Sequence, residues 1–291
     1  MLFEMRDGRT VQVWSGGDPH GRMVLLLPGC PDSRLVATSG VDAAARAGVR
    51  LVSINRPGYG ASTPYVSTQS SAADDLVEVA ERLGHGRFGL IGMSIGGTYA
   101  AVAAARHPDR VRALVLVETQ VRTDEGSVAE KVERYAPEFL RWRAGIVGDD
   151  PDDETLGNRW AALLDGGASA ALARRSPGQH AAAAREALDD PSGYLRDAAL
   201  AFSPWDHPPE AIACPTLLHY GSVVDDGTPV AGTRARRPHP RRPARAARPP
   251  APRAAARAVG PADRLRRLIL SSLASSTPRR VISVCLHTAS A

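Results

Sequence analysis

The 291-residue sequence has no apolar run that approaches the roughly 18 residues needed for a membrane-spanning helix. Its first residues, MLFEMRDGRTVQVW, lack the basic segment followed by an apolar segment that marks a secretory signal. The three cysteines, Cys30, Cys214 and Cys285, are far apart and lack the spacing of metal ligands, so we expect reduced thiols and no zinc site. These absences argue against a membrane-spanning protein and favour the cytoplasm as its location.

Acidic residues are almost absent from the last part of the chain. From Thr228 onward there are 14 arginines, no lysine and one acidic residue, Asp263. The net charge of +5 therefore divides into +13 for this tail and −8 for residues 1–227. Nucleic-acid binding is thus not expected of the body of the chain, and only the tail is basic enough for it.

One serine lies between a short apolar run and an Ala-rich stretch. The run Phe88–Ile91 is typical of a strand buried on both faces, and residues 98–106 lack Gly and Pro, as a packed helix should. Between them, Gly92-Met93-Ser94-Ile95-Gly96 places Ser94 at a sharp strand-to-helix turn, where the residues two before and two after must be small. Such a turn would lift the serine hydroxyl clear of the sheet and bring the first free N–H groups of the helix beside it.

These elements resemble those of the α/β-hydrolase superfamily, in which Ser94 matches the nucleophile position. The resemblance extends from about Leu2 to Val230. It implies an α/β-hydrolase fold, with a mostly parallel central sheet, helices on both faces and a helical cap inserted after the sixth strand. It also implies a serine hydrolase of the carboxylesterase type, without a cofactor or metal. A dehalogenase or an epoxide hydrolase of this fold would carry Asp at position 94, so those reactions are disfavoured.

The resemblance also assigns the two backbone N–H groups of an oxyanion hole. One belongs to Ile95, directly after the serine. The other belongs to Cys30, in the turn that follows a buried strand expected at Met23–Leu27. Pro28 stands where the family usually carries a histidine that braces this loop, so we expect the stability of the loop to differ. The alternative interpretation is an ordinary Pro-Gly turn at the end of a strand.

Further signals follow in the order that this family shows. Leu2–Met5 and Thr10–Trp14 predict a hairpin, and Leu51–Ile54 predicts a buried strand. Residues 55–62, NRPGYGAS, resemble the D-x-P-G-x-G-x-S turn of the family, with Asn55 where Asp is common. We interpret this turn as structural support beneath the active site.

The pattern becomes Ala-rich and helical between Thr119 and Ala201. We interpret this stretch as the cap, which folds over the serine and shapes a substrate pocket. Trp142 and Trp160 within it are expected to be packing residues rather than ligand contacts. The predicted organisation is a first core part at 1–118, the cap at 119–205, a second core part at 206–230 and a tail at 231–291.

The catalytic acid is expected after another buried strand, Cys214–Tyr220. In the superfamily the loop that follows this strand supplies the acid, and Asp225, four residues before Pro229, is the matching residue. Asp226 and Glu118 are alternatives for the acid. A solvated turn is the alternative interpretation of the two aspartates.

The triad also needs a histidine that accepts the proton of Ser94, and no histidine has the setting that the family requires. Residues 231–257 hold nine Arg, nine Ala and six Pro, so we expect neither a regular helix nor a buried strand there. His239 lies inside this stretch. His287 follows Val281–Leu286, a run suited to a short strand. Six further histidines have no local feature that places them beside the serine, although His180 and His207 are left open: His20, His85, His107, His180, His207 and His219.

Two hypotheses account for the tail. Arg, Ala and Pro with almost no acids are what a GC-rich coding sequence yields in a wrong reading frame, so a shift near residues 227–232 would remove the native last helix, strand and histidine. The rival is a genuine basic arm for nucleic acid or an anionic membrane surface. The abrupt end of the family pattern favours the frameshift.

The sequence thus predicts a serine hydrolase that cleaves carboxylic esters of small molecules through an acyl-enzyme intermediate, impaired by the loss of its histidine. The alternative is a non-catalytic ligand-binding protein on the same fold. Neither the acyl size of the substrate nor the oligomeric state follows from the sequence.

Overall fold

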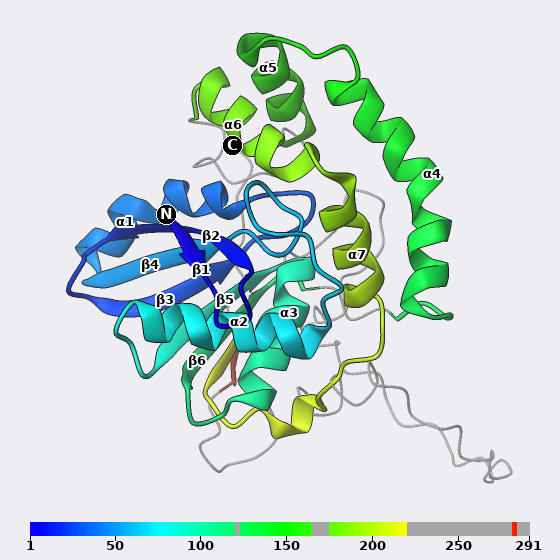
Figure 1. Cartoon of the computed structure of the whole chain (residues 1–291). Helices are drawn as coiled ribbons and strands as arrows, with labels where there is room; N and C mark the ends of the chain where they lie inside the picture. Colours follow the sequence, from blue (N-terminus) through cyan, green and yellow to red (C-terminus); the bar gives the residue numbers. More distant parts are fainter. Residues whose placement is uncertain (120–122, 165–174, 220–280, 284–291) are drawn as a thin grey trace, which may run out of the picture.

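The central element is an eight-stranded sheet with the strand order β1-β2-β4-β3-β5-β6-β7-β8 (Figure 1). A computed structural model describes residues 1–119, 123–164, 175–219 and 281–283 of the chain. β2 pairs antiparallel with β1 and β4, and every other pair of neighbours is parallel, which confirms the predicted hairpin and the mostly parallel sheet. The strands are β1 (Leu2–Glu4), β2 (Thr10–Gly17), β3 (Arg22–Leu27), β4 (Val49–Ile54), β5 (Phe88–Met93), β6 (Val111–Val117), β7 (Thr216–His219) and β8 (Val281–Ser283).

Strand β3 separates two apolar layers. Met23 and Leu25 belong to the main core cluster, which also holds the apolar faces of α2 and α3, whereas Val24 packs on a second cluster with Ala44 of α1. Because successive side chains of a strand point to opposite faces, α1 and the pair α2 and α3 cover opposite faces of the sheet. The elements concerned are the 3-10 helix η1 (Arg34–Gly40) and the helices α1 (Val41–Arg46), α2 (Gln69–Arg82) and α3 (Ile95–Arg106).

Four helices follow β6 and form a second body of structure, the helical insert (residues 128–201), above and beside the sheet in Figure 1. Its core contains Trp160 with Trp142 packed against it, and the rings of Phe139 and Tyr194 stack with centroids 3.8 Å apart. Both tryptophans thus contribute to packing within the insert. The helices are α4 (Val128–Val147), α5 (Asp153–Leu164), α6 (Pro177–Leu188) and α7 (Pro191–Ala201), followed by the 3-10 helix η2 (Pro209–Ala211).

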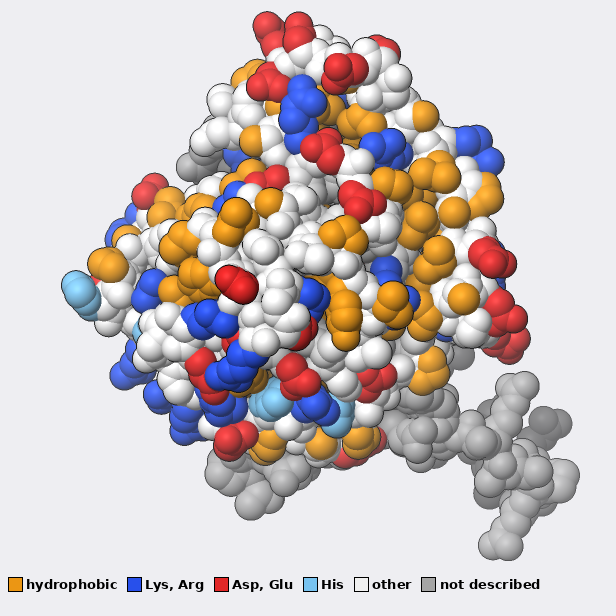
Figure 2. Space-filling view, in the orientation of Figure 1, with side chains coloured by type: hydrophobic (Ala, Val, Ile, Leu, Met, Phe, Trp, Pro, Cys, Tyr) orange, Lys and Arg blue, Asp and Glu red, His pale blue; other side chains and the backbone are white. Residues whose placement is uncertain are grey.

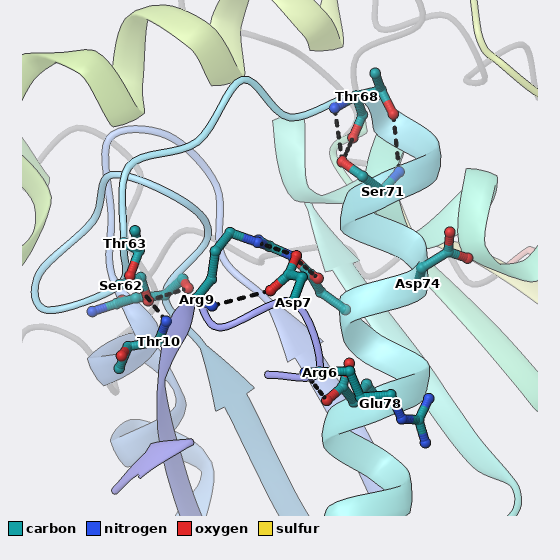
Figure 3. A network of polar contacts seen from close by, with 12 residues as sticks. Arg6, Asp7, Arg9, Thr10, Ser62, Thr63, Thr68, Ser71, Asp74 and Glu78 are labelled. Carbon is teal, nitrogen blue, oxygen red and sulfur yellow. Dashed lines mark hydrogen bonds and ion pairs between the residues drawn. The ribbon is translucent and has the colours of Figure 1, made fainter. Parts of the chain in front are cut away.

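Polar contacts hold the turn between β1 and β2 against α2 (Figure 3). Arg9 donates from Nη2 to Asp75 Oδ1 and from Nε to Asp7 Oδ2, each at 2.6 Å. Helix α2 begins after Thr68, whose hydroxyl accepts from the Ser71 N–H while the Ser71 hydroxyl accepts from the Thr68 N–H. The Arg9–Asp75 pair thus holds α2 beside the antiparallel edge of the sheet, and the Thr68–Ser71 hydrogen bonds cap its start.

The surface carries both charged and apolar side chains. In the view of Figure 2, hydrophobic side chains gather over α4, whereas acidic and basic side chains mix over the lower part of the molecule, where α2 lies. No helix among the described residues combines the length and the apolar character that crossing a bilayer would require.

Strand β8 is the part of the 231–291 tail that the structure describes. It pairs in parallel with β7, with Leu218 opposite Ser283. The strand lies within Val281–Leu286, where the sequence indicated a short strand. It extends the sheet by one strand beyond β7.

Candidate active site

Ser94 lies between Met93, the last residue of β5, and Ile95, the first residue of α3. Its backbone has φ 49° and ψ −124°, and a positive φ is a strained conformation for a residue with a side chain. The turn is held on both sides, because the Ser94 N–H donates to Val117 O at 2.8 Å and its carbonyl accepts from the Gly97 N–H at 2.9 Å. Ser94 is half-buried, so part of it remains open to solvent.

Two glycines allow α3 to begin very close to the sheet. A Cβ on Gly96 would clash with the carbonyl oxygens of Leu27 and Pro28 at the end of β3. A Cβ on Gly97 would clash with the side chain of Thr119, just after β6. The first turn of α3 therefore lies against both strand ends, and its free N–H groups are at the carboxyl edge of the parallel strands.

The loop that follows β3 lies beside the serine. A Cβ on Gly29 would be 3.3 Å from Ser94 Cβ and 4.0 Å from Ser94 Oγ, so the Gly29–Cys30 peptide passes close to the hydroxyl. The Cys30 N–H donates no hydrogen bond to any described residue. Ile95 begins α3, so its N–H has no acceptor within the helix. Both predicted oxyanion donors thus come from segments that flank Ser94.

The thiol of Cys30 is not the reactive group of this loop. Its Sγ lies 3.0 Å from Tyr59 Oη. Burial raises the pKa of the Cys30 thiol and raises the pKa of Tyr59 well above its ordinary value. Both groups therefore stay protonated at neutral pH, and the nucleophilic thiolate form of Cys30 is disfavoured.

A buried ion pair lies directly behind the same loop. Arg56 donates from Nε to Asp197 Oδ2 at 2.7 Å and from Nη2 to the same oxygen at 2.5 Å. Arg56 is 3% exposed and Asp197, on α7, is 5% exposed. Burial opposes the charge of Arg56, but the Asp197 carboxylate outweighs it and holds the pKa of Arg56 above its ordinary value. Arg56 therefore stays charged.

Arg56 also contacts the loop itself. Its Nη1 donates to Pro28 O at 3.0 Å, and its Nη2 donates to Gly29 O at 3.3 Å. Arg56 is not among the site residues predicted from the sequence, because the turn 55–62 as a whole is interpreted as structural support. The available signal was that Arg56 is the single charged residue of the segment 55–62.

Asp32 adds a titratable group two residues after Cys30. Burial raises the pKa of its carboxyl to about 6, although the Ser33 N–H, which donates to Oδ1 at 2.7 Å, acts in the opposite direction. The loop therefore gains a full negative charge only above mildly acidic pH.

The predicted acid Asp225, its alternative Asp226, and His239 and His287 lie outside the described residues. Glu118, the third candidate for the acid, is described and exposed, with φ 48° directly after β6. Its N–H donates to the carbonyl of the last β7 residue at 2.9 Å. The sheet register pairs Met93 with Val117 and Val117 with His219, so Ser94 and Glu118 follow paired residues at one edge.

None of the described histidines is hydrogen-bonded to Ser94. His207 has Nε2 3.2 Å from Arg106 Nη1 and 3.3 Å from Ser70 Oγ, near the ends of α2 and α3. His180 is buried in α6. Over the described ranges, no group of three or more His, Cys, Asp or Glu residues is arranged to hold a metal ion.

Comparison with protein families gives one match that spans most of the chain. The family model described as alpha/beta hydrolase fold matches residues 22–221, from the start of β3 to just beyond β7. The match therefore includes the Ser94 turn, the Cys30 loop and the whole helical insert. It ends four residues before Asp225.

Curated relatives match over shorter segments. A 2-hydroxy-6-oxononadienedioate/2-hydroxy-6-oxononatrienedioate hydrolase of Burkholderia vietnamiensis is 42% identical over 80 residues, which are 26% of this chain and 28% of that protein. A proline iminopeptidase of Neisseria meningitidis is 39% identical over 71 residues, 23% of each chain. The aligned segments thus cover less than a third of either relative.

Solved structures resemble the chain over a much larger part. A structure from a study of carboxylesterases of Nitrososphaera gargenis superposes with a TM-score of 0.55 and 17% identity, over 78% of this chain and 82% of that chain. At this level of identity the similarity concerns the fold.

Proposed function

This chain belongs to the α/β-hydrolase family, and we propose that it is a serine hydrolase that cleaves carboxylic esters of small molecules. The observation that carries the proposal is the strained turn at Ser94, flanked by the N–H groups of Cys30 and Ile95, neither of which donates a hydrogen bond to a described residue. We propose that this turn is a nucleophile elbow. A hydroxyl in this setting can attack a carbonyl carbon, and the two N–H groups can stabilise the charge that develops on the carbonyl oxygen.

The proposed reaction has two halves. Ser94 Oγ attacks the ester carbonyl carbon, the Oγ–C bond forms, and the resulting oxyanion accepts hydrogen bonds from Cys30 and Ile95. The bond to the alcohol oxygen then breaks, and the proton released by Ser94 passes through a general base to that oxygen. Water attacks the acyl-enzyme by the same route and releases the carboxylic acid. Asp225 is proposed to orient the base, and no cofactor takes part.

The general base is the catalytic group that this chain is least able to supply. The family match ends at Gly221, and His239 and His287, the two histidines that follow, lack the family setting. We therefore propose that the chain as printed acylates slowly, because no positioned base takes the Ser94 proton. In serine proteases, oxyanion stabilisation and substrate binding alone leave a rate about 10³ to 10⁴ times that of the reaction in water.

The frameshift hypothesis accounts for this weakness at the level of the gene. Reading the coding DNA beyond codon 227 in the other two frames tests it without any protein. One frame should encode a helix, a short apolar strand and a Gly-His pair. Stop codons or no such segment in both frames would contradict the hypothesis.

We propose that the helical insert is the cap of this hydrolase and shapes the acyl pocket over Ser94. The position of the four helices directly after β6 supports this role. We also propose a cytoplasmic location, which the few scattered cysteines favour. A small-molecule ester is the substrate class that this assignment implies.

Hydrolysis of p-nitrophenyl acetate, butyrate and octanoate tests the proposed function. The chain as printed should give slow, saturable hydrolysis through an acylated Ser94, and Ser94→Ala should lower the rate, because only oxyanion stabilisation and substrate binding then remain, while the circular dichroism spectrum stays unchanged. His239→Ala and His287→Ala should each leave the rate within about twofold. A rate that Ser94→Ala does not change would overturn the proposal. A loss of about a hundredfold in one histidine variant would identify the base and contradict the frameshift.

The missing base also favours a second function, a non-catalytic ligand-binding protein on the same fold. This alternative predicts that a non-hydrolysable ester analogue binds the wild type and Ser94→Ala with the same affinity while neither protein turns over any ester. Saturable hydrolysis that depends on Ser94 would exclude it.

A further inference from the structure

We propose that Arg56 is a positioning residue that aims the Cys30 N–H at the oxyanion site, and that Asp197 of the helical insert holds Arg56 in place. The inference rests on the proposed function, in which Cys30 supplies one of the two oxyanion donors. It adds a residue pair that neither the family match nor the sequence motifs assign.

The Gly29–Cys30 peptide group sets the direction of the Cys30 N–H. A peptide unit is planar, and in the trans form its C=O and N–H point in opposite directions. The Gly29–Cys30 bond is trans. Arg56 Nη2 donates to Gly29 O at 3.3 Å, so the Cys30 N–H must point away from Arg56. Rotation of this peptide would break that hydrogen bond and turn the donor away.

A second contact restrains the same loop. Arg56 Nη1 donates to Pro28 O at 3.0 Å, so one guanidinium holds two successive carbonyls. A planar fork of donors can do this, whereas the compact ammonium of a lysine cannot keep the same set of contacts. Since Gly29 lies against Ser94, the two carbonyls are held next to the hydroxyl that reacts.

Asp197 fixes the guanidinium from the other side. Its Oδ2 accepts from both Nε and Nη2 of Arg56, and both side chains are almost completely buried. The rings of Tyr59 and Tyr99 lie 5.5 and 5.1 Å from the guanidinium carbon, which leaves little space for another rotamer. Because Asp197 belongs to α7, the direction of the Cys30 N–H depends on the docking of the helical insert against the core.

The variants that test this pair are Arg56→Lys and the double variant Arg56→Met/Asp197→Leu. The lysine keeps the charge beside Asp197 but not the two carbonyl contacts. The double variant removes both charges and so leaves no unpaired ion in the interior. Arg9→Lys is the matched control, because Arg9 and Asp75 form another ion pair of low exposure, 12% and 7%, on the far edge of the sheet.

The first readout is the rate at which N-ethylmaleimide modifies Cys30, resolved from Cys214 by peptide mass spectrometry. Both Arg56 variants should raise the Cys30 rate at least tenfold and leave Cys214 within about twofold, because the loop that carries Cys30 is released. Arg9→Lys should change neither rate. This readout does not require any activity of Ser94.

The second readout is phosphonylation of Ser94 by a fluorophosphonate, measured as a limiting rate constant and a reversible affinity. Loss of one oxyanion donor costs about 10²- to 10³-fold in rate in serine proteases. The Arg56 variants should therefore lower the limiting rate constant at least thirtyfold and leave the reversible affinity within about threefold. A variant whose fold had merely loosened would show a lower limiting rate constant and a weaker reversible affinity.

Unchanged Cys30 reactivity in both Arg56 variants would overturn the inference, whatever Ser94 does. Faster modification of Cys30 in the Arg56 variants, together with an unchanged phosphonylation rate, would overturn the inference as well. Arg56 would then brace the loop without any effect on the oxyanion site. If Cys30 is released but wild-type Ser94 is never labelled, the proposed function fails while the bracing role of Arg56 stands.

Discussion

At the scale of single residues, the α-carbon of Gly96 faces the carbonyl oxygens of Leu27 and Pro28, and a methyl group there has no room. Gly96→Ala must push α3 away from the end of β3. We expect a loss of about 1–3 kcal/mol in the free energy of unfolding, measured by urea denaturation.

Gly145→Ala is the control for this substitution. Gly145 lies in α4, and a Cβ there would have no atom within 4 Å. Alanine is favoured over glycine inside a helix by about 0.5–1 kcal/mol, so this variant should be more stable than the wild type. Equal stability of Gly96→Ala and the wild type would contradict the close contact described for Gly96.

Residue roles could be predicted from sequence where the requirement is local. Ser94 and its flanking glycines belong to one turn, so five adjacent residues carry the signal. Arg56 could not be identified in this way, because its partner Asp197 lies 141 positions later and only the fold brings the two together. The position of the Cys30 N–H beside Ser94 depends equally on the fold, through the approach of Gly29 to Ser94.

At the scale of elements, α6 is joined to the turn after β4 by a polar network. Glu186 of α6 accepts from Asn55 Nδ2 at 2.9 Å and from Arg34 Nη2 at 2.6 Å. Asn55 also donates to Gln12 Oε1 at 2.7 Å. The network explains why Asn55 stands where the family often has Asp: a second carboxylate would face Glu186 and Gln12 without a proton to donate.

Asn55→Asp should therefore destabilise the protein by about 1–3 kcal/mol at neutral pH, because two hydrogen bonds are lost and the new carboxylate faces the Glu186 carboxylate and the Gln12 amide oxygen. Thermal or urea unfolding measures the change. The added carboxyl should take up a proton in the folded state as the pH falls, so the loss should shrink towards pH 5.

A double-mutant cycle with Glu186→Gln supplies the control. The glutamine amide can donate to the new aspartate, and the pair Asn55→Asp/Glu186→Gln keeps one carboxylate beside Arg34. It should recover at least half of the lost stability. Additive losses in the double variant would show that the two side chains do not interact as described.

The elements themselves were largely predictable, whereas their ends were not. Continuous apolar runs at β3 and β5 indicated buried strands, and the structure has strands at those positions. Helix α3 begins at Ile95 rather than near Thr98, because the pair Gly96-Gly97 disguises its first turn in the sequence. Helix α2 begins at Gln69, because Thr68 and Ser71 cap it by contacts that the hydrophobic pattern does not reveal.

At the scale of the whole molecule, the fold was predictable because several weak signals occur in one order along the chain. Strand, Pro-Gly turn, strand, Arg-Pro-Gly-Tyr-Gly turn, helix and serine turn together specify the α/β-hydrolase fold, which this chain has. The base was not predictable, because the family match ends at Gly221 and the following residues are mostly Arg, Ala and Pro.

The central claim is that Ser94 is the nucleophile, and covalent labelling by a fluorophosphonate tests it most directly. After a long incubation, intact mass spectrometry of the full chain should detect one adduct, and peptide mapping should place it on Ser94. The same treatment of Ser94→Ala should give no adduct. An adduct on a different residue, or equal labelling of wild type and Ser94→Ala, would contradict the account.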